Sequence, residues 1–482
     1  MPPSEGAAFG LDVGTSGLKG IALAGDGRVL AQAERSYAFQ TPQPGWSEQE
    51  PELWWQAASA VLDELRAATG APRGIGLSGQ MHGLVVLDGA QKPLRPAILW
   101  NDQRTAAQCE EIEARLGREH LIELTGNRAL TGFTAPKLLW LRDHEPHVYE
   151  RVEAILLPKD YVRLRLCGEL AGDVSDASGT LLFDVAHRTW SEEVCRALEI
   201  PLEWLPRMLE SPELSGTTAG GTPLAAGAGD QAAGALGVGV AEPEIASVVL
   251  GTSGVVFSPL SAYAPDPQGR THTFCHAVPG AWHAMGVMLS AAGSLAWLRN
   301  AIDPAASFEA LVAEADAWPP GCEGLVFLPY LAGERTPHAD PDARGAFAGL
   351  TLRHDRGALV RAVLEGVAFG LRDCLDVLLA ATARPRAARI SGGGARSALW
   401  AKIVASALEL PLTRTLVDEG AAFGAALLGG VAGGIWGDVG EAIAAAVAPT
   451  ETIEPDAAWA RVYAESLERY RALYPALKGA LA

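Results

Sequence analysis

The sequence predicts an α/β protein made of two related domains that face a cleft. Two observations carry this prediction. A strand, a Gly-Thr-Ser-Gly turn and a second strand occur near residue 15 and again near residue 252, and such repetition in the same context is typical of related domains. Amphipathic helices and short apolar strands also alternate along both halves, which is the pattern of α/β folds.

The first half begins with three strands joined by glycine turns. Asp12 lies at the end of the first strand, and the Gly-Thr-Ser-Gly turn at 14–17 leads into the second. A Gly-Asp-Gly turn at 25–27 leads to the third strand, because an Asp-Gly pair between apolar runs favours a hairpin. Further strands are expected at 74–77 and 84–87.

The first long helix is expected to begin at Pro51. Proline favours the first turn of a helix, and apolar residues follow it at helical spacing. Ser47 and Glu50 have the three-residue spacing of a capping box, so the sequence predicts a capped helix start at this point.

The second half repeats the hairpin and then adds helices. A long amphipathic helix is expected over 360–378. Residues 420–437 form an uncharged run rich in Ala and Gly, too weakly hydrophobic for a membrane helix, so we expect a buried helix packed closely on a neighbour. A final helix is expected over 455–474 with Pro475 as its stop. Strands are expected at 325–328 and 388–390.

The boundary between the two domains is expected near residue 243. A glycine- and alanine-rich stretch ends at Val240, and a turn at 241–245 separates it from the next strand. The sequence therefore predicts an N-terminal domain at residues 1–243 and a C-terminal domain at residues 244–482, each long enough to bury its own core.

Composition excludes several classes of function. Lys and Arg total 38 against 57 Asp and Glu, the net charge is −19, and no basic run is present. This balance repels polyanions, so we expect small-molecule partners and neither nucleic acid nor membrane. The six cysteines are scattered without metal-site spacing, which is typical of a reducing compartment. With no signal-peptide pattern at its start, the sequence favours a cytoplasmic protein.

The two Gly-Thr-Ser-Gly turns are candidate phosphate sites. Glycine lets backbone N–H groups approach phosphate oxygens, and the hydroxyls add hydrogen bonds. Asp12 is placed to hold Mg²⁺ through water, as phosphoryl transfer requires. Taken singly, each turn is equally an ordinary hairpin, whereas the matched pair favours phosphate binding. The candidate residues are Thr15, Ser16, Thr252 and Ser253.

One carboxylate lies in the otherwise apolar segment 226–239. Asp230 follows Gly229 and precedes Gln231. It is either the N-cap of a helix or a base in a desolvated site, and the two roles are compatible. As a base, Asp230 would accept the proton of a substrate hydroxyl while that oxygen attacks a phosphorus atom.

Two polar segments favour a polyhydroxylated ligand. The first contains Met81 and His82, and the second contains Trp100 and Asn101. Adjacent amide, imidazole, carboxylate and guanidinium groups give each hydroxyl of such a ligand a partner. A lone histidine is more often structural, and the cluster shifts this balance toward ligand binding only modestly.

A third glycine-rich segment follows the strand expected at 388–390. Three consecutive glycines at 392–394 leave room for a charged or flat group, and a following helix would attract an anion. A flexible loop is the alternative, but the Gly-Thr-Ser-Gly turn in the same half favours a nucleotide site. The candidate residues are Gly393, Gly394 and Ala395.

From Phe9 to Gly430 the sequence resembles the FGGY family of carbohydrate kinases and, within it, the xylulokinase group. The resemblance implies two actin- or hexokinase-like ATPase domains of the ribonuclease H-like type that flank a cleft. The motifs that carry it are Asp12–Gly17, Gly79–Gly83, Ile98–Asp102, Gly132–Lys137, Leu157–Tyr161, Ser175–Gly179, Gly229–Asp230, Leu250–Gly254, Gly333–His338 and Ser391–Arg396.

The resemblance also implies a reaction, in which ATP phosphorylates D-xylulose to D-xylulose 5-phosphate with the help of Mg²⁺. Asp230 corresponds to the catalytic base and, with Asp12, to the metal site, while Met81 and His82 correspond to ketose contacts. A homodimer is the implied assembly. The implied phosphate and nucleotide contacts are Thr15, Thr252, Gly293 and Gly394.

One position departs from part of the family. Gln231 follows the expected base, where some xylulokinases carry Asn and glycerol kinases carry Gln. The longer side chain keeps an amide for a sugar hydroxyl but changes its reach. The alternatives are therefore a kinase of another ketopentose or polyol, such as ribulose or glycerol, and an actin-like ATPase that needs no sugar.

Overall fold

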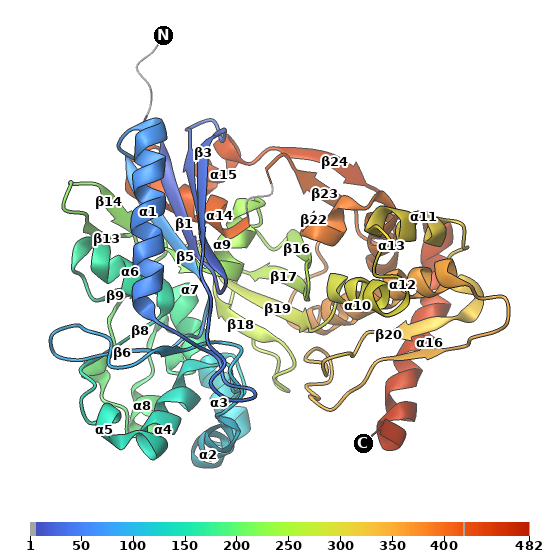
Figure 1. The fold of residues 1–482 in the computed structure, drawn as a ribbon, viewed down its shortest axis with the longest axis horizontal. Helices are drawn as coiled ribbons and strands as arrows, with labels where there is room; N and C mark the ends of the chain where they lie inside the picture. Colours follow the sequence, from blue (N-terminus) through green and yellow to red (C-terminus); the bar gives the residue numbers. More distant parts are fainter. Residues whose placement is uncertain (1–5, 418–419, 482) are drawn as a thin grey trace, which may run out of the picture.

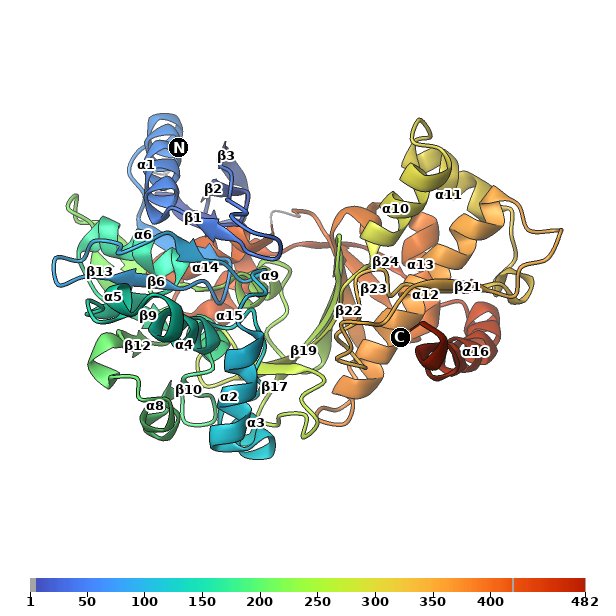
Figure 2. The ribbon, with the colours of Figure 1, turned by 60° about the horizontal axis from the view of Figure 1, so that its bottom comes forward.

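The structure is a computed structural model that describes residues 6–417 and 420–481 (Figure 1). Two α/β halves lie side by side in both views, the first coloured blue to green and most of the second yellow to red (Figures 1 and 2). Each half is built around a seven-stranded sheet. Among the helices of the described residues, none combines the length and hydropathy needed to cross a membrane.

The N-terminal sheet has the strand order β13-β14-β5-β1-β2-β3, with β15 also beside β5. Strand β1 runs antiparallel to β2 and parallel to β5. Its strands are β1 (Ala8–Val13), β2 (Gly17–Leu23), β3 (Val29–Ser36), β5 (Gly74–Gly79), β13 (Leu214–Thr217), β14 (Pro223–Ala225) and β15 (Ala228–Gly229).

The C-terminal sheet repeats the same core, in the order β18-β19-β17-β16-β22-β23-β24. Strand β16 runs antiparallel to β17 and parallel to β22, as β1 does with β2 and β5. The prediction of two equivalent hairpins is therefore confirmed. The strands are β16 (Ile245–Leu250), β17 (Gly254–Leu260), β18 (His272–Cys275), β19 (Trp282–Met288), β22 (Ala387–Ser391), β23 (Leu412–Thr415) and β24 (Pro449–Ile453).

Five short ribbons complete the strands. They pair β4 (Glu48–Gln49) with β7 (Ala97–Ile98), β6 (Val85–Leu87) with β8 (Ala154–Leu156), β9 (Ala171–Asp173) with β12 (Arg207–Leu209), β10 (Phe183–Asp184) with β11 (Thr189–Trp190), and β20 (Val326–Leu328) with β21 (Ala346–Ala348).

Helices cover both faces of the N-terminal sheet. On one face, Trp54, Val61 and Leu65 of α1 share a core with Leu11 and Leu77 of the sheet. On the other, α14 packs against β1 and β5, and α9 packs against α14 and β5. The helices of this half are α1 (Pro51–Thr69), α2 (Ala106–Leu116), α3 (Arg118–Thr125), α4 (Thr134–His144), α5 (Pro146–Tyr149), α6 (Pro158–Cys167), α7 (Val174–Ala177), α8 (Glu192–Leu198) and α9 (Asp230–Gly237), with 3₁₀ turns η1 (Ser178–Thr180) and η2 (Leu202–Trp204).

In the C-terminal half, α12 lies at the centre and packs on β17, β19 and β20. The predicted long helix is confirmed, and most of its residues are buried, so it is a core helix without a broad exposed face. The remaining elements are α10 (Ala292–Ile302), α11 (Phe308–Asp316), α12 (Arg356–Leu378), α13 (Ala398–Leu408), α14 (Gly420–Ala432), α15 (Val439–Ala446) and α16 (Ala457–Leu481), with 3₁₀ turns η3 (Cys322–Gly324) and η4 (Gly393–Arg396).

Helix α14 belongs to the second half of the sequence but packs on the sheet of the first (Figures 1 and 2). Glycines allow the close approach: a Cβ at Gly76 would lie 1.8 Å from the carbonyl oxygen of Ala425, and one at Gly10 would lie 2.1 Å from that of Ala422. The predicted buried helix is thus confirmed. The division of the chain at residue 243 stays a prediction.

The predicted capping box at Ser47 is wrong. Helix α1 does begin at Pro51, but Glu50 is its N-cap and makes no side-chain cap hydrogen bond. The backbone N–H of Ser47 donates to Asp102 (2.7 Å), and Glu48 forms an ion pair with Arg104 (2.7 Å). Glu48 and Gln49 form strand β4, which pairs with β7, so the chain before α1 is extended and the Ser47 side chain does not cap the helix.

The predicted end of the last helix at Pro475 is also wrong, because α16 continues to Leu481. Proline removes one backbone hydrogen bond from a helix. Here the turn around it is held by side chains: the Tyr474 hydroxyl donates to Asp340 (2.5 Å), and Lys478 forms an ion pair with Asp340 (2.9 Å).

Candidate active site

Asp12 and Asp230 emerge at the same edge of the N-terminal sheet. Asp12 pairs in register with Ser78 of β5. Gly229 pairs with Gly79 of β5, and Asp230 follows it directly. Since all three strands are parallel, their carboxyl ends meet where open α/β sheets bind ligands. Asp230 is the first residue of α9 and Gly229 is the N-cap, so the reading of Asp230 as the N-cap is wrong.

The surroundings of these two carboxyl groups disfavour their ionised forms. Burial raises the pKa of Asp12 to about 6, while the nearby Ser78 hydroxyl and the charge of Lys19 oppose the shift. Burial and then the charge of Asp12 raise the pKa of Asp230 to about 7, which the backbone and side-chain amides of Gln231 oppose. A carboxylate that titrates near neutral pH is suited to general base catalysis.

The same pair fits a divalent cation. Oδ1 of Asp12 is buried and has no hydrogen-bond partner among the described residues. Residues 6–417 and 420–481 contain no group of three or more His, Cys, Asp or Glu that could hold a metal. Mg²⁺ commonly takes one or two carboxylates and completes its shell with water and substrate phosphates, so this donor set fits Mg²⁺ bound together with a nucleotide.

His82 lies in the turn after β5, in the left-handed conformation with φ 69°. Its Nδ1 donates to the carbonyl oxygen of Gly179 (2.6 Å), since a carbonyl oxygen only accepts, and this leaves Nε2 as an acceptor. Burial lowers the pKa of His82 to about 3. Its own carbonyl accepts from Lys137 Nζ (2.8 Å) and Thr134 Oγ1 (3.1 Å). The ring is therefore neutral and fixed.

Met81 joins His82 to the segment that carries Asp230. Its side chain is 5% exposed and lies against Gly229, where a Cβ would come within 2.9 Å of Met81 Cγ. The structure thus brings together Met81, His82 and Asp230, which the sequence reasoning had assigned to separate constellations.

Trp100 links this group to the first glycine turn. Its side chain is 44% exposed, and Nε1 donates to Thr15 Oγ1 (2.9 Å), which donates to Gln80 (3.0 Å). The Thr15 hydroxyl therefore donates its proton to the Gln80 side chain in this structure. Ser16 is exposed at the tip of the turn. Asn101 Oδ1 is buried without a hydrogen-bond partner in the described part of the chain.

The predicted nucleotide residues form a second group in the C-terminal half. The N–H of Gly293 donates to the carbonyl of Thr252 (3.1 Å), which holds the start of α10 against the turn that exposes Thr252 and Ser253. A Cβ at Gly394 would lie 2.6 Å from Leu250 Cγ. The Gly-Thr-Ser-Gly turn follows β16 and the glycines at 392–394 follow β22. The two segments are far apart in sequence but lie close together because β16 and β22 are neighbouring parallel strands.

Gly393 and Gly394 begin a 3₁₀ turn, η4, of which Gly392 is the N-cap, and they do not form the first turn of an α-helix. Helix α13 begins only at Ala398 and is capped by the Ser397 hydroxyl. The carbonyl of Ala395 accepts from Arg414 Nη2 (2.7 Å). A cavity of about 340 Å³ lies beside this turn and is lined by Ile390, Gly392, Ala395, Arg396, Arg414 and Thr415.

Sequence reasoning gave no role to Lys159, which the structure places beneath the site. Its ammonium is fully buried and forms ion pairs with Asp160 (2.6 Å), Asp173 (2.6 Å) and Asp176 (3.0 Å). Lys159 and Asp160 lie more than ten positions before Asp173 and Asp176, so the sequence alone does not indicate that the four side chains form one cluster. The signal that could have found it is the presence of charged residues in segments that are otherwise apolar, because buried charges require partners.

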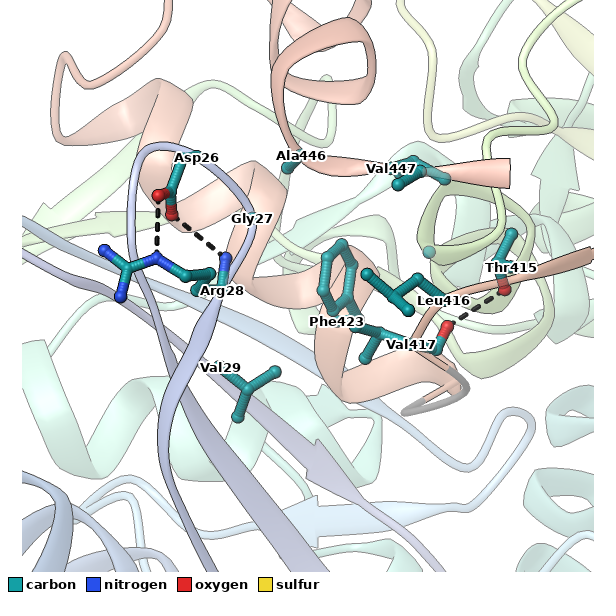
Figure 3. A pocket seen from close by; sticks show the side chains of 12 residues that line it. Asp26, Gly27, Arg28, Val29, Thr415, Leu416, Val417, Phe423, Ala446 and Val447 are labelled. Carbon is teal, nitrogen blue, oxygen red and sulfur yellow. Dashed lines mark hydrogen bonds and ion pairs between the residues drawn. The ribbon is translucent and has the colours of Figure 1, made fainter. Parts of the chain in front are cut away.

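A cavity of about 330 Å³ lies apart from both groups (Figure 3). It is bounded by the turn between β2 and β3, the end of β23, and parts of α14 and α15. Val29, Val417, Phe423 and Val447 contribute apolar side chains to its lining, and none of the predicted site residues lines it. This cavity is therefore separate from the candidate chemistry, whereas the cavity beside η4 is lined in part by the candidate residue Ala395.

The chain matches known proteins along most of its length. Residues 7–237 match the N-terminal domain of the FGGY family of carbohydrate kinases, and residues 246–433 match its C-terminal domain. The xylulose kinase of Escherichia coli K12 is 44% identical over 436 residues, covering 88% of this chain and 90% of that protein. The xylulose kinase of Staphylococcus xylosus is 34% identical and covers 97% and 99%.

Solved structures agree with these matches. The structure described as a xyloylose kinase from Brucella ovis is 41% identical, with a TM-score of 0.93 over 98% of this chain and 99% of that one. The agreement extends over both halves and confirms the predicted two-domain, actin- or hexokinase-like fold. The chain belongs to the FGGY family of carbohydrate kinases.

Proposed function

We propose that the protein transfers the γ-phosphate of ATP to D-xylulose and releases D-xylulose 5-phosphate and ADP. Family membership and the similarity to xylulose kinases of several bacteria support this reaction. The observation that carries the proposal is the grouping of Asp230 with Met81 and His82 at the sheet edge that also holds Asp12.

The sugar would bind on the N-terminal half. Nε2 of the neutral His82 accepts a hydrogen bond from a sugar hydroxyl, and the Gln231 amide and Asn101 Oδ1 offer further partners. The exposed face of Trp100 covers the sugar. Asp230 removes the proton of the terminal hydroxyl while that oxygen forms a bond to the γ-phosphorus. The bond from phosphorus to the bridging oxygen breaks, and ADP leaves with its electron pair.

The nucleotide would bind mainly on the C-terminal half. Thr252 and Ser253 meet the phosphates, Gly293 supports that turn, and η4 with Gly393, Gly394 and Ala395 borders the nucleoside. Thr15 and Ser16 meet the terminal phosphate from the opposite side. Closure of the two halves brings the hydroxyl and the phosphate into line and excludes water as a competing acceptor.

Asp12 and Asp230 are the residues that would hold Mg²⁺. When bound, the metal offsets negative charge on the phosphates during transfer. With Mg²⁺ present, Asp230 also ionises more readily, because an adjacent cation favours the charged form of a carboxyl group. The base would therefore be charged at neutral pH in the complex with MgATP.

ADP release from MgATP tests the proposal, with D-xylulose, L-xylulose, D-ribulose, L-ribulose, glycerol and no sugar in parallel. Strong release with D-xylulose alone supports it. Preference for ribulose or glycerol would reassign the substrate and identify Gln231 as the position to examine, and release that needs no sugar would overturn the kinase assignment.

The role of Asp230 has its own test. Asp230→Ala should lose most turnover while MgATP still binds, and Asp63→Ala, at an exposed carboxylate of α1, is the matched control. Near-full turnover of Asp230→Ala would remove it from the base role. The homodimer implied by the resemblance and the cytoplasmic location expected from composition stay predictions, which light scattering and cell fractionation can check.

A further inference from the structure

A buried turn connects the two sides of the sugar site. It runs from Asp173 at the end of β9 through α7 to the 3₁₀ turn η1, which ends at Thr180. Helix α7 packs against β15, which leads into Asp230, and against β18 of the C-terminal sheet. Figure 1 shows α7 within the first half of the molecule, at the left of the view. The proposed function gives this turn no role.

One end of the turn contacts the segment that presents Asp230. The Ser175 hydroxyl accepts a hydrogen bond from the backbone N–H of Gly229 (3.1 Å) and donates to Asp173 Oδ1 (2.6 Å). Gly229 is the N-cap of α9 and directly precedes Asp230. The position of the Asp230 backbone therefore depends on Ser175.

The other end of the turn contacts His82. The carbonyl of Gly179 accepts from His82 Nδ1 (2.6 Å). A Cβ at Gly179 would lie 2.6 Å from that nitrogen and 3.0 Å from Met81 Cε, so the approach requires glycine. Ser175 in α7 and Gly179 in η1 are four residues apart in one buried turn, which fixes His82 and Asp230 relative to one another.

The turn itself is held by buried charges. Asp173 Oδ1 accepts from the backbone N–H groups of Ser175 and Asp176 (both 3.0 Å). Asp173 Oδ2 forms an ion pair with Lys159 (2.6 Å), and the side chains of Asp173, Asp176 and Lys159 are all 0% exposed. Groups buried in this way have no water to replace a lost partner, so the network keeps one arrangement.

We propose that Ser175 is a positioning residue for phosphoryl transfer: through Gly229 it sets Asp230 at the distance from His82 that the sugar hydroxyl requires. This inference rests on the proposed function. Removing the hydroxyl leaves the Gly229 N–H without its partner and frees the start of α9 to shift. A displacement of about 1 Å at a reacting group costs on the order of 100-fold in rate.

Ser178 provides a matched control. It lies on the same turn, is also 0% exposed, and its hydroxyl donates to the carbonyl of Val174 and accepts from the N–H of Cys275 (3.0 Å). Replacing Ser178 by Ala removes the same group from the same turn, three residues further along, but leaves the contact between Ser175 and Gly229 intact. A general loss of packing would affect the two variants alike.

The experiment is steady-state kinetics of Ser175→Ala and Ser178→Ala with D-xylulose and MgATP. We expect kcat of Ser175→Ala to fall about 10- to 100-fold with the KM for MgATP unchanged, and kcat of Ser178→Ala to stay within about threefold of the parent. Ser175→Thr keeps the hydroxyl and should recover most of the lost turnover. Equal losses in the two Ala variants would overturn the proposal.

Two further variants separate the possible failures. If Ser175→Ala does not fold, Ser175→Cys keeps the volume with a weak acceptor, and turnover equal to that of Ser175→Thr would overturn the proposal. Asp230→Ala is assayed alongside. If it keeps near-full turnover, the proposed base role fails; if it is inactive while Ser175→Ala matches Ser178→Ala, only the positioning role fails.

Discussion

Replacing Asp230 by Asn should stabilise the fold, and the gain should grow with pH. The pKa of Asp230 is raised from 3.8 to about 7, first by burial and then by the charge of Asp12. A carboxyl group with a higher pKa in the folded chain binds its proton more tightly when folded. Stability therefore falls as pH rises from about 4 to about 7, and above this range the folded protein carries the full cost of the charge.

The size of the effect follows from the same values. One pKa unit corresponds to about 1.4 kcal/mol, so a rise from 3.8 to about 7 amounts to about 4 kcal/mol at pH 8.5. At pH 5 the unfolded chain is already ionised but the folded one is not, and the cost is about 2 kcal/mol. Asn carries no charge at either pH. The stability gap between Asp230→Asn and the parent should therefore widen by about 2 to 3 kcal/mol from pH 5 to pH 8.5.

Urea unfolding at the two pH values, without Mg²⁺ or nucleotide, measures this gap. Asp63→Asn is the control for the change from carboxylate to amide, because its side chain is 74% exposed. A stability gap for Asp230→Asn that is constant, or larger at pH 5, would refute the conclusion that burial disfavours the charged form of Asp230 in the free protein. Mg²⁺ should narrow the gap at pH 8.5, because a cation relieves the cost of the charge.

Three further predictions follow from the packing and from the proposed metal. Gly179→Ala should raise the KM for D-xylulose by roughly tenfold without changing that for MgATP, because its Cβ would lie 2.6 Å from His82 Nδ1; an unchanged sugar KM in steady-state kinetics would argue against His82 as a sugar contact. Gly76→Ala should lower the free energy of unfolding by about 3 kcal/mol in urea, because its Cβ would lie 1.8 Å from the carbonyl oxygen of Ala425. The control Gly234→Ala places its Cβ where no atom lies within 4 Å, and it should raise the free energy of unfolding by up to about 1 kcal/mol. Equal stabilities of the two variants would contradict this account of the contact between α14 and the sheet. Chelating Mg²⁺ with EDTA should stop sugar-dependent ADP release, and excess Mg²⁺ should restore it; release that continues in EDTA would exclude a metal requirement.

Features set by neighbours in sequence could be predicted. Glycine turns fix the geometry of the two hairpins locally, and both are found, with Asp12 at the end of β1. Asp230 could be identified as a candidate site residue because it is the one carboxylate in an apolar segment, and burial of such a group is typical of functional sites. The pairing of β1 and β15 with β5 then brings the two carboxylates to one edge.

Features set by distant partners could not be predicted. Ser47 has capping-box spacing, yet Glu48 and Gln49 form strand β4, which pairs with β7. The hydrogen bond from Gly229 to Ser175 spans 54 positions, and neither residue signals the other. Local propensity is a weak guide wherever a buried polar group finds its partner elsewhere in the chain.

The position of helix α14 in the sequence also affects the order in which this protein folds while it is being synthesised. A ribosome completes the N-terminal sheet at β15 near residue 229, but the helix that covers one of its faces follows only at 420–432. At roughly 5 to 20 residues per second, about 10 to 40 s pass between the two. During this interval the glycine-lined face of β1 and β5 is open to other proteins. The first half of the nascent chain thus needs the end of the second half before it can finish folding, and a chaperone has its longest access to the chain at this face.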